Sequence, residues 1–170
     1  MKKKYNLALT PITKSDVIIQ ASQAFSGIAD KYILGKNSLL HVTLYQFEIE
    51  ESAIEKSWKE VCEIWKEKPI KLVFEKVSCL TFDNNIYWIS LVPSEVEILH
   101  KMHGKIAGGI KLPVKKDFDP HMTLINTRDK SCEREVSKFL VSYELIGDDF
   151  VLKLGECDDV GQFTRFVCQV

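Results

Sequence analysis

The segment Phe118-Asp119-Pro120-His121-Met122-Thr123-Leu124-Ile125 decides how this chain of 170 residues is interpreted, because its core occurs twice. His121-Met122-Thr123-Leu124 has the same form as His41-Val42-Thr43-Leu44, eighty positions earlier. A single His-x-Thr-apolar tetrapeptide is a weak signal, since such short strings arise by chance. Two of them, at matching points of two similar halves, indicate a repeated unit that builds one shared site.

The periodicity of apolar residues predicts the same order of elements in both halves. The first half has the order β-α-β-α-β and the second β-α-β-α-β-β, with the histidine motif on the second strand of each. A turn at Asp83-Asn84-Asn85 marks the midpoint. The expected strands are 4–10, 38–49, 70–77, 86–92, the segment around His121, about 145–155 and 162–170. The expected helices follow Thr13, Ser52 and Ser94, with a shorter one at roughly 130–141.

Three of these helices carry sequence signals for a side-chain cap at the N-terminus. Thr13 precedes Asp16, and Ser52 precedes Glu55, both at the spacing of a capping box. Ser94 follows a proline and is expected to be the N-cap of the third helix.

This order predicts an α+β protein, a single two-lobed domain over residues 1–170 with halves of about 1–82 and 83–170. Two mostly antiparallel sheets are expected to face each other across a cleft, with the helices outside. A pseudo-twofold internal repeat would then bring the two histidine strands together.

Side chains two residues apart on a strand point to the same face. Regular alternation puts His41, Thr43, Tyr45 and Phe47 on one face. On the second histidine strand, alternation likewise puts His121, Thr123, Ile125 and Thr127 on one face. Tyr45 is therefore a possible substrate contact, with sheet packing as the alternative. Arg128 is a possible source of positive charge near the cleft, with an ordinary surface cation as the alternative.

Two imidazoles and two hydroxyls around one point suit the cleavage of a phosphodiester. One imidazole takes a proton from the attacking oxygen while the other protonates the leaving oxygen. Imidazole suits both roles because its pKa lies near neutrality. The hydroxyls can donate hydrogen bonds to the non-bridging oxygens in the transition state. The catalytic candidates are therefore His41 and His121, and the phosphate-binding candidates are Thr43 and Thr123.

Composition excludes several other classes of protein. The formal net charge is −1, which argues against a protein that tracks along an extended DNA duplex. The five cysteines include no C-x-x-C pair, so no zinc or redox motif is predicted. His100 and His103 have a spacing that can hold a metal, but with no evident third ligand a solvated helix face is favoured. We expect no metal, no cofactor, no membrane segment, a cytoplasmic location and a monomer.

The paired tetrapeptides resemble the signature of the two-histidine (2H) phosphoesterases, which include bacterial RNA ligase-like proteins and RNA 2′,3′-cyclic phosphodiesterases. The lead-in Phe118-x-Pro120 and the hydrophobic strand 86–92 are similar to those of this family. The resemblance implies a bilobal fold with the two His-x-Thr pairs as its active site. The sequence departs from many bacterial members at Asn126, where they carry arginine, and at Tyr45-Gln46-Phe47, where they carry Phe-Leu-Gly.

Three functions remain open at this point. The first is a metal-independent phosphodiesterase, a phosphoric diester hydrolase acting on 2′,3′-cyclic phosphate at RNA or nucleotide ends. The second is a 2′,5′-oligonucleotide (oligoadenylate) phosphodiesterase or RNA-end trimming enzyme that uses the same four residues. The third is a nucleotide or RNA-end binding module without turnover.

Overall fold

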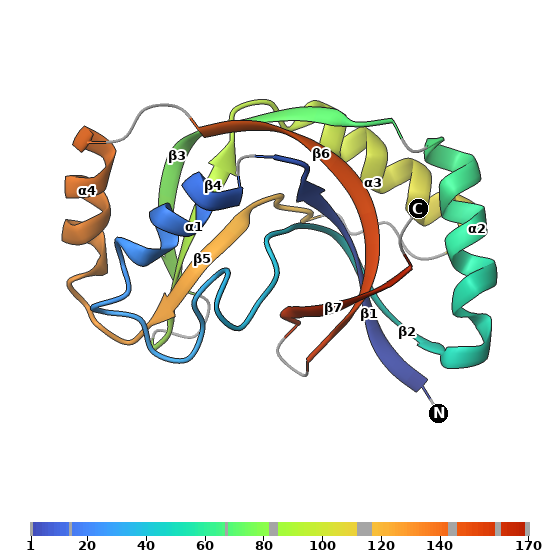
Figure 1. Cartoon of the computed structure of the whole chain (residues 1–170), viewed down its shortest axis with the longest axis horizontal. Coiled ribbons are helices and arrows are strands. Elements are labelled where there is room, and N and C mark those ends of the chain that lie inside the picture. The colour runs from blue at the N-terminus through green and yellow to red at the C-terminus, as the bar shows by residue number, and fades with distance from the viewer. Residues whose placement is uncertain are drawn as a thin grey trace.

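Figure 1 shows a strongly curved sheet with helices at both ends of the molecule. The computed structural model describes residues 2–13, 15–66, 68–81, 85–111, 117–142, 146–158 and 161–168. The strands are β1 (Lys2–Pro11), β2 (Val42–Glu50), β3 (Ile70–Thr81), β4 (Tyr87–Pro93), β5 (Met122–Thr127), β6 (Ile146–Cys157) and β7 (Phe163–Cys168). The helices are α1 (Ser15–Gln23), α2 (Ile54–Trp65), α3 (Glu97–Gly109) and α4 (Cys132–Ser142), with a 3-10 turn η1 (Glu51–Ala53) before α2.

The α+β class and the predicted order of elements are both confirmed. Each half runs strand, helix, histidine strand, helix, strand, and β7 is the additional strand of the second half. The predicted midpoint turn at Asp83 and Asn84 lies outside the described residues.

The predicted helix caps are wrong in three places. The Thr13 hydroxyl donates instead to the buried carboxylate of Asp148, at 2.7 Å between the two oxygens. The residue before α2 is Ala53, which makes no side-chain cap, so the Ser52 capping box does not form. Ser94 donates its hydroxyl to the Val73 carbonyl and lies before the N-cap residue of α3, Val96. Thr13 and Ser94 thus bond to neighbouring strands, and Ser52 lies in the 3-10 turn before α2.

The strands form one continuous sheet in the order β2-β1-β6-β3-β4-β5, with β7 paired to β6, instead of the two separate sheets expected. The order is symmetric about the β6–β3 pair. Each histidine strand pairs with the first strand of its own half, as β2–β1 and β5–β4, and the third strand on each side comes from the other half. This exchange ties the two halves together through antiparallel pairing between residues 70–74 and 146–150.

The core lies between this sheet and the helices that cover it. Helix α2 buries Ile54, Trp58 and Val61, and α3 buries Leu99, Met102 and Ile106. Figure 1 shows α2 and α3 together at one end of the molecule and α4 at the other. Among the described helices, none combines the length and apolar character needed to cross a membrane.

A β-bulge interrupts each histidine strand at the leucine of its motif. On β2, Thr43 is the partner of Ala8 and Tyr45 of Leu7, so Leu44 is the extra residue. On β5, Thr123 is the partner of Ser90 and Ile125 of Ile89. An extra residue reverses the alternation beyond it, because side chains alternate with period two. The faces predicted for Tyr45 and Ile125 are therefore wrong.

Two of the cysteines lie together although they are distant in the sequence. The Sγ atoms of Cys79 on β3 and Cys132 at the start of α4 are 2.7 Å apart. Both are free thiols, as are Cys62 and Cys157. No pair motif joins the two positions, so this contact was not predicted from the sequence.

Candidate active site

His41 is held immediately before β2 by a contact within its own segment. Its Nδ1 donates to the carbonyl of Leu39 at 2.6 Å, which leaves Nε2 as the acceptor nitrogen of the neutral ring. The Leu39 amide in turn donates to the Phe163 carbonyl on β7, at 2.9 Å. The Phe163 ring packs on the imidazole with 5.3 Å between ring centroids. β7 therefore both supports and covers His41.

His121 occupies the equivalent position before β5. Its Nδ1 donates to the carbonyl of Asp119 at 2.8 Å, again two residues earlier. The Asp119 carboxylate also lies 3.7 Å from Nδ1. Phe118 anchors this lead-in by stacking on His103 of α3, with 4.3 Å between centroids and 7° between planes. The two histidines thus share one local geometry, which presents Nε2 of each ring away from its own backbone.

Both threonines receive a hydrogen bond from the neighbouring strand of their own half. Asn6 on β1 donates its side-chain amide to the Thr43 hydroxyl at 3.0 Å. Ser90 on β4 donates to the Thr123 hydroxyl at 3.5 Å. A hydroxyl that accepts such a bond keeps its own proton to donate elsewhere. Each threonine is therefore oriented as a hydrogen-bond donor.

The two motifs line one cavity of about 260 Å³. His41, Thr43, His121 and Thr123 all contribute to its wall. The remaining lining residues are Gln46, Trp88, Gly161 and Gln162. The structure thus brings together the four residues that the repeat singled out, from segments eighty residues apart.

Gln46 enters this cavity because of the β2 bulge, which puts it on the same face as Thr43. Its amide nitrogen donates to the Gly161 carbonyl at 2.8 Å, in the loop between β6 and β7. Gly161 has φ +88°, and a Cβ there would lie 2.7 Å from the Gln46 amide. The backbone conformation therefore favours glycine at this position, and a larger residue would also displace the Gln46 amide.

The environments of the two imidazoles differ. His41 is 6% exposed, whereas the side chain of His121 is 35% exposed. Burial lowers the pKa of His41 from 6.5 to about 4, against the opposing effect of the Leu39 carbonyl, and the charge of His121 lowers it further. His41 is therefore neutral at pH 7, with Nε2 able to accept a proton.

Several residues that the sequence suggested for the site lie elsewhere. Tyr45 is buried and stacks on His103 at 5.2 Å between centroids, so the packing alternative is correct. Arg128 pairs with Asp30 at 3.1 Å and lines a neighbouring cavity. His103 is buried and its Nδ1 donates to the Leu44 carbonyl at 2.8 Å, so the predicted solvated helix face is wrong for this residue. The described residues contain no group of three or more metal-ligating side chains.

Sequence analysis missed the residues that support the site from other strands. Asn6 and Ser90 each interrupt a run of apolar residues in a strand that is otherwise buried, and that interruption is the signal that could have found them. Gln46 and Gln162 had no comparable signal, because the bulge and the β6–β7 loop place them. Trp88 was expected on a strand, but nothing indicated that it faces the cavity.

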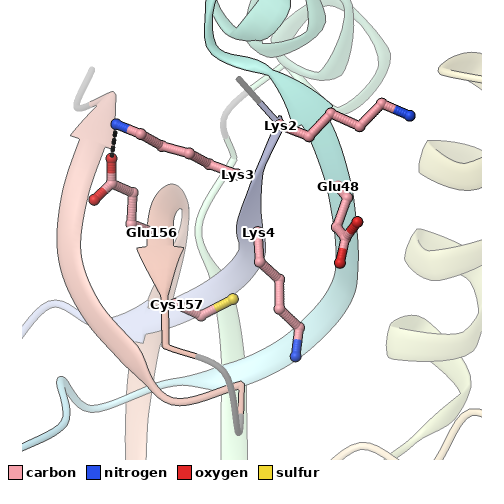
Figure 2. Close-up of a pocket in the computed structure, with 6 residues that line it drawn as sticks. All are labelled: Lys2, Lys3, Lys4, Glu48, Glu156 and Cys157. Atoms are coloured by element: carbon pink, nitrogen blue, oxygen red, sulfur yellow. Dashed lines mark hydrogen bonds and ion pairs between the residues drawn. The ribbon is translucent and has the colours of Figure 1, made fainter.

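A second, polar cavity of about 400 Å³ lies further along β1 and β2, beyond the Asn6–Gln46 partner pair. Figure 2 shows Lys4 extending between Cys157 and Glu48, and Lys3 turned toward Glu156. Lys3 is paired with Glu51 at 2.9 Å and with Glu156 at 3.4 Å. Burial raises the pKa of the Cys157 thiol to about 11, which keeps it protonated and a poor nucleophile.

The fold matches solved structures over nearly the whole chain. LigT of E. coli complexed with 3′-AMP is 13% identical, with 98% of this chain and 95% of LigT covered and a TM-score of 0.66. A structure described as a phosphoesterase is 14% identical, with 98% and 95% covered and a TM-score of 0.61. Usb1 of Kluyveromyces marxianus with uridine monophosphate is 13% identical, with 97% and 96% covered and a TM-score of 0.51.

At these identities the similarity establishes the fold. The chain has the fold of LigT, a member of the 2H phosphoesterase superfamily, as the paired motifs predicted. A scan against protein-family models found no match, and a search of curated proteins found none either.

Proposed function

We propose that this protein is a metal-independent phosphodiesterase that hydrolyses 2′,3′-cyclic phosphate at RNA or nucleotide ends. The observation that carries the proposal is the single cavity lined by both His-x-Thr pairs. Each imidazole is fixed at Nδ1 by a backbone carbonyl, and each hydroxyl is fixed by an acceptor contact. Such preorganised groups suit phosphoryl transfer, in which positioning and electrostatic stabilisation supply most of the catalysis.

His41 is the general base in this proposal. Its lowered pKa keeps Nε2 unprotonated at neutral pH, so that it can take a proton from a water molecule as the water attacks phosphorus. The carbonyl of Leu39 stabilises the imidazolium that forms, because Nδ1–H already donates to it. Burial thus sets the resting protonation state, and the carbonyl supports the charged state during the reaction.

His121 is the general acid. It donates a proton to the ribose oxygen that leaves phosphorus, which opens the ring and yields a phosphomonoester beside a free hydroxyl. The water supplies the new P–O bond, and one P–O bond to ribose breaks. Thr43 and Thr123 donate to the two non-bridging oxygens, where negative charge is concentrated in the transition state.

Two observations on neighbours in fold support a nucleotide substrate. The LigT structure is a complex with 3′-AMP, and the Usb1 structure is a complex with uridine monophosphate. A nucleoside monophosphate is also the product that ring opening of a nucleoside cyclic phosphate would leave. The proposal for this chain therefore names nucleotide ends instead of simple alkyl diesters.

The test is an assay of the purified protein against nucleoside 2′,3′-cyclic phosphates and a 2′,5′-linked oligoadenylate, with products separated by chromatography. We expect the cyclic phosphates to be consumed, with the same rate in the presence of EDTA. Consumption of the 2′,5′ oligomer alone would replace the proposed substrate with the second alternative. Nucleotide binding without turnover of any of these diesters would overturn the enzyme proposal and favour the binding module.

A further inference from the structure

The neighbouring cavity that Arg128 lines is a third one, beside the catalytic cavity, and shares two residues with it. It has a volume of about 280 Å³, and Trp88 and Gln162 line both spaces. Tyr32, Ile86 and Asn126 form other parts of its wall. Because Trp88 and Gln162 line both cavities, a group held in this cavity lies next to a phosphate held between the histidines.

The wall of this cavity is fixed by hydrogen bonds from Asn126. Its side-chain oxygen accepts from the backbone amides of Lys31 and Tyr32, at 3.1 and 2.7 Å. The Tyr32 hydroxyl donates to the Thr123 carbonyl at 3.1 Å, and its ring lies 6.3 Å from the Trp88 ring between centroids. Asn126 therefore clamps residues 31–32 against β5, and the wall forms before any ligand arrives.

Gln162 supplies an amide that its surroundings leave unpaired. The residue is 9% exposed, and its backbone is held by Asp158 in the turn between β6 and β7. Within the described part of the chain its side-chain amide makes no hydrogen bond, yet it is not sealed from the cavities that it lines. The amide is therefore open to both cavities, where a ligand edge that pairs with it would replace the water that solvates it in the free protein.

The charge around this cavity fits a neutral group better than a second phosphate. Lys31 and Arg128 are balanced by Asp30 and Asp158, and Arg128 is already paired with Asp30. An anion placed here would meet two carboxylates. An uncharged aromatic ring with donors and acceptors on its edge meets an indole and an amide instead.

We propose that Trp88 and Gln162 form a nucleobase subsite, with the base stacked on the indole and its edge bonded to the Gln162 amide. The inference rests on the proposed function and names its substrate class as nucleotides recognised through the base. A glutamine amide offers a donor and an acceptor side by side, which matches the edges of nucleobases. Stacking on an aromatic side chain contributes about 1–3 kcal/mol per base.

The first experiment compares a nucleoside 2′,3′-cyclic phosphate with glycerol 1,2-cyclic phosphate, which has the same kind of ring and no base. Trp88→Leu should lower kcat/KM for the nucleoside substrate about 5- to 150-fold more than for the glycerol substrate, chiefly through KM. Trp65→Phe, in α2 and outside both cavities, is the matched control. Equal losses on both substrates would overturn the subsite, since Trp88 would then act only on the catalytic cavity.

The second experiment does not require turnover. Titration calorimetry measures the binding of a nucleoside 3′-monophosphate and of ribose 5-phosphate to the wild-type protein and to Gln162→Ala. The nucleotide should bind more tightly than the sugar phosphate, and Gln162→Ala should reduce that difference. Equal affinity of the wild type for the two compounds would overturn the subsite. A protein that binds the nucleotide selectively but hydrolyses no diester would keep the subsite and reject the proposed function.

Discussion

The His41 and His121 sides of the cavity are built from the same parts and yet differ in burial. Each has an imidazole bonded at Nδ1 to the carbonyl two residues earlier, and each has a bulge at the motif leucine. β7 exists on one side only, and its Phe163 covers His41. One additional strand therefore buries the histidine of one of two similar motifs, and this burial lowers the pKa of His41.

The space for this cover comes from a glycine on β6. A Cβ at Gly155 would lie 2.3 Å from the Phe163 ring and 2.3 Å from the Arg165 carbonyl. The absence of a side chain there lets β7 approach β6 closely enough for Phe163 to reach His41. The asymmetry between the two histidines thus depends on residues far from either motif.

The largest effect should come from removing either imidazole. His41→Ala and His121→Ala should each lower kcat by roughly 10²–10⁴-fold, the usual contribution of a general base or acid. His100→Ala, an exposed histidine on α3, is the control for loss of an imidazole as such. The measurement is steady-state turnover of a nucleoside 2′,3′-cyclic phosphate, with far-UV circular dichroism to show that each variant is folded. Full activity in either variant would contradict the two-histidine mechanism.

A second effect concerns the stability of the folded protein in acid. The pKa of His41 falls from 6.5 to about 4 on folding, so between these values the unfolded chain binds the proton and the native chain does not. The free energy of unfolding should therefore drop by about 3 kcal/mol as the pH falls from 6.5 to 4, and this contribution is complete above 6.5.

Urea unfolding at a series of pH values measures this contribution. His41→Asn should remove it, because an amide can keep the bond to Leu39 without titrating. His121→Asn is the matched control and should retain most of the pH dependence of the wild type, because burial, the main cause of the lowered pKa of His41, is unchanged. The same pH dependence in the wild type and in His41→Asn would show that burial of His41 is not its source.

A third effect tests the cover directly. Phe163→Ala should let water reach His41, so that its pKa rises from about 4 toward 6.5 and the acid limb of the kcat/KM profile moves up with it. Phe166→Ala on the same strand is the control. Because deleting a buried phenylalanine side chain costs about 3–5 kcal/mol of stability, Phe163→Leu serves if the alanine variant does not fold. If the acid limb does not move in a folded variant, the Phe163 ring is not what lowers the pKa of His41.

The smallest effect compares the two residues that orient the threonines. Asn6→Ala should lower kcat about two- to tenfold, in line with a hydrogen bond of about 0.5–1.5 kcal/mol. Ser90→Ala should have less effect, because its contact with Thr123 is 3.5 Å and that of Asn6 with Thr43 is 3.0 Å. The Asn6 Oδ1 atom is buried with no partner among the described residues, so Asn6→Ala should cost little stability.

A double-mutant cycle distinguishes positioning from a general structural role. If Asn6 acts through Thr43, then Asn6→Ala should have almost no further effect on kcat in a Thr43→Val background. Independent losses that add in full would contradict this coupling. Urea unfolding of the same variants shows whether any change in kcat follows a change in stability.

The sequence by itself determined the order of the elements and the four central residues of the site. Apolar periodicity is local, so it located each strand and helix within a few residues. The repeat of His-x-Thr singled out His41, Thr43, His121 and Thr123 because their spacing within a strand is also local. The resemblance to the 2H phosphoesterases then supplied the expectation of a cleft, and the similar solved structures confirm the fold.

Only the tertiary structure decided which further side chains reach the cavity. A bulge depends on the register of the partner strand, so alternation along β2 predicted Tyr45 where the structure places Gln46. The exchange of β3 and β6 between the halves, and the position of β7, depend on pairings between distant segments. The burial that lowers the pKa of His41 arises from those pairings. The two similar motifs therefore hold their histidines at different degrees of burial.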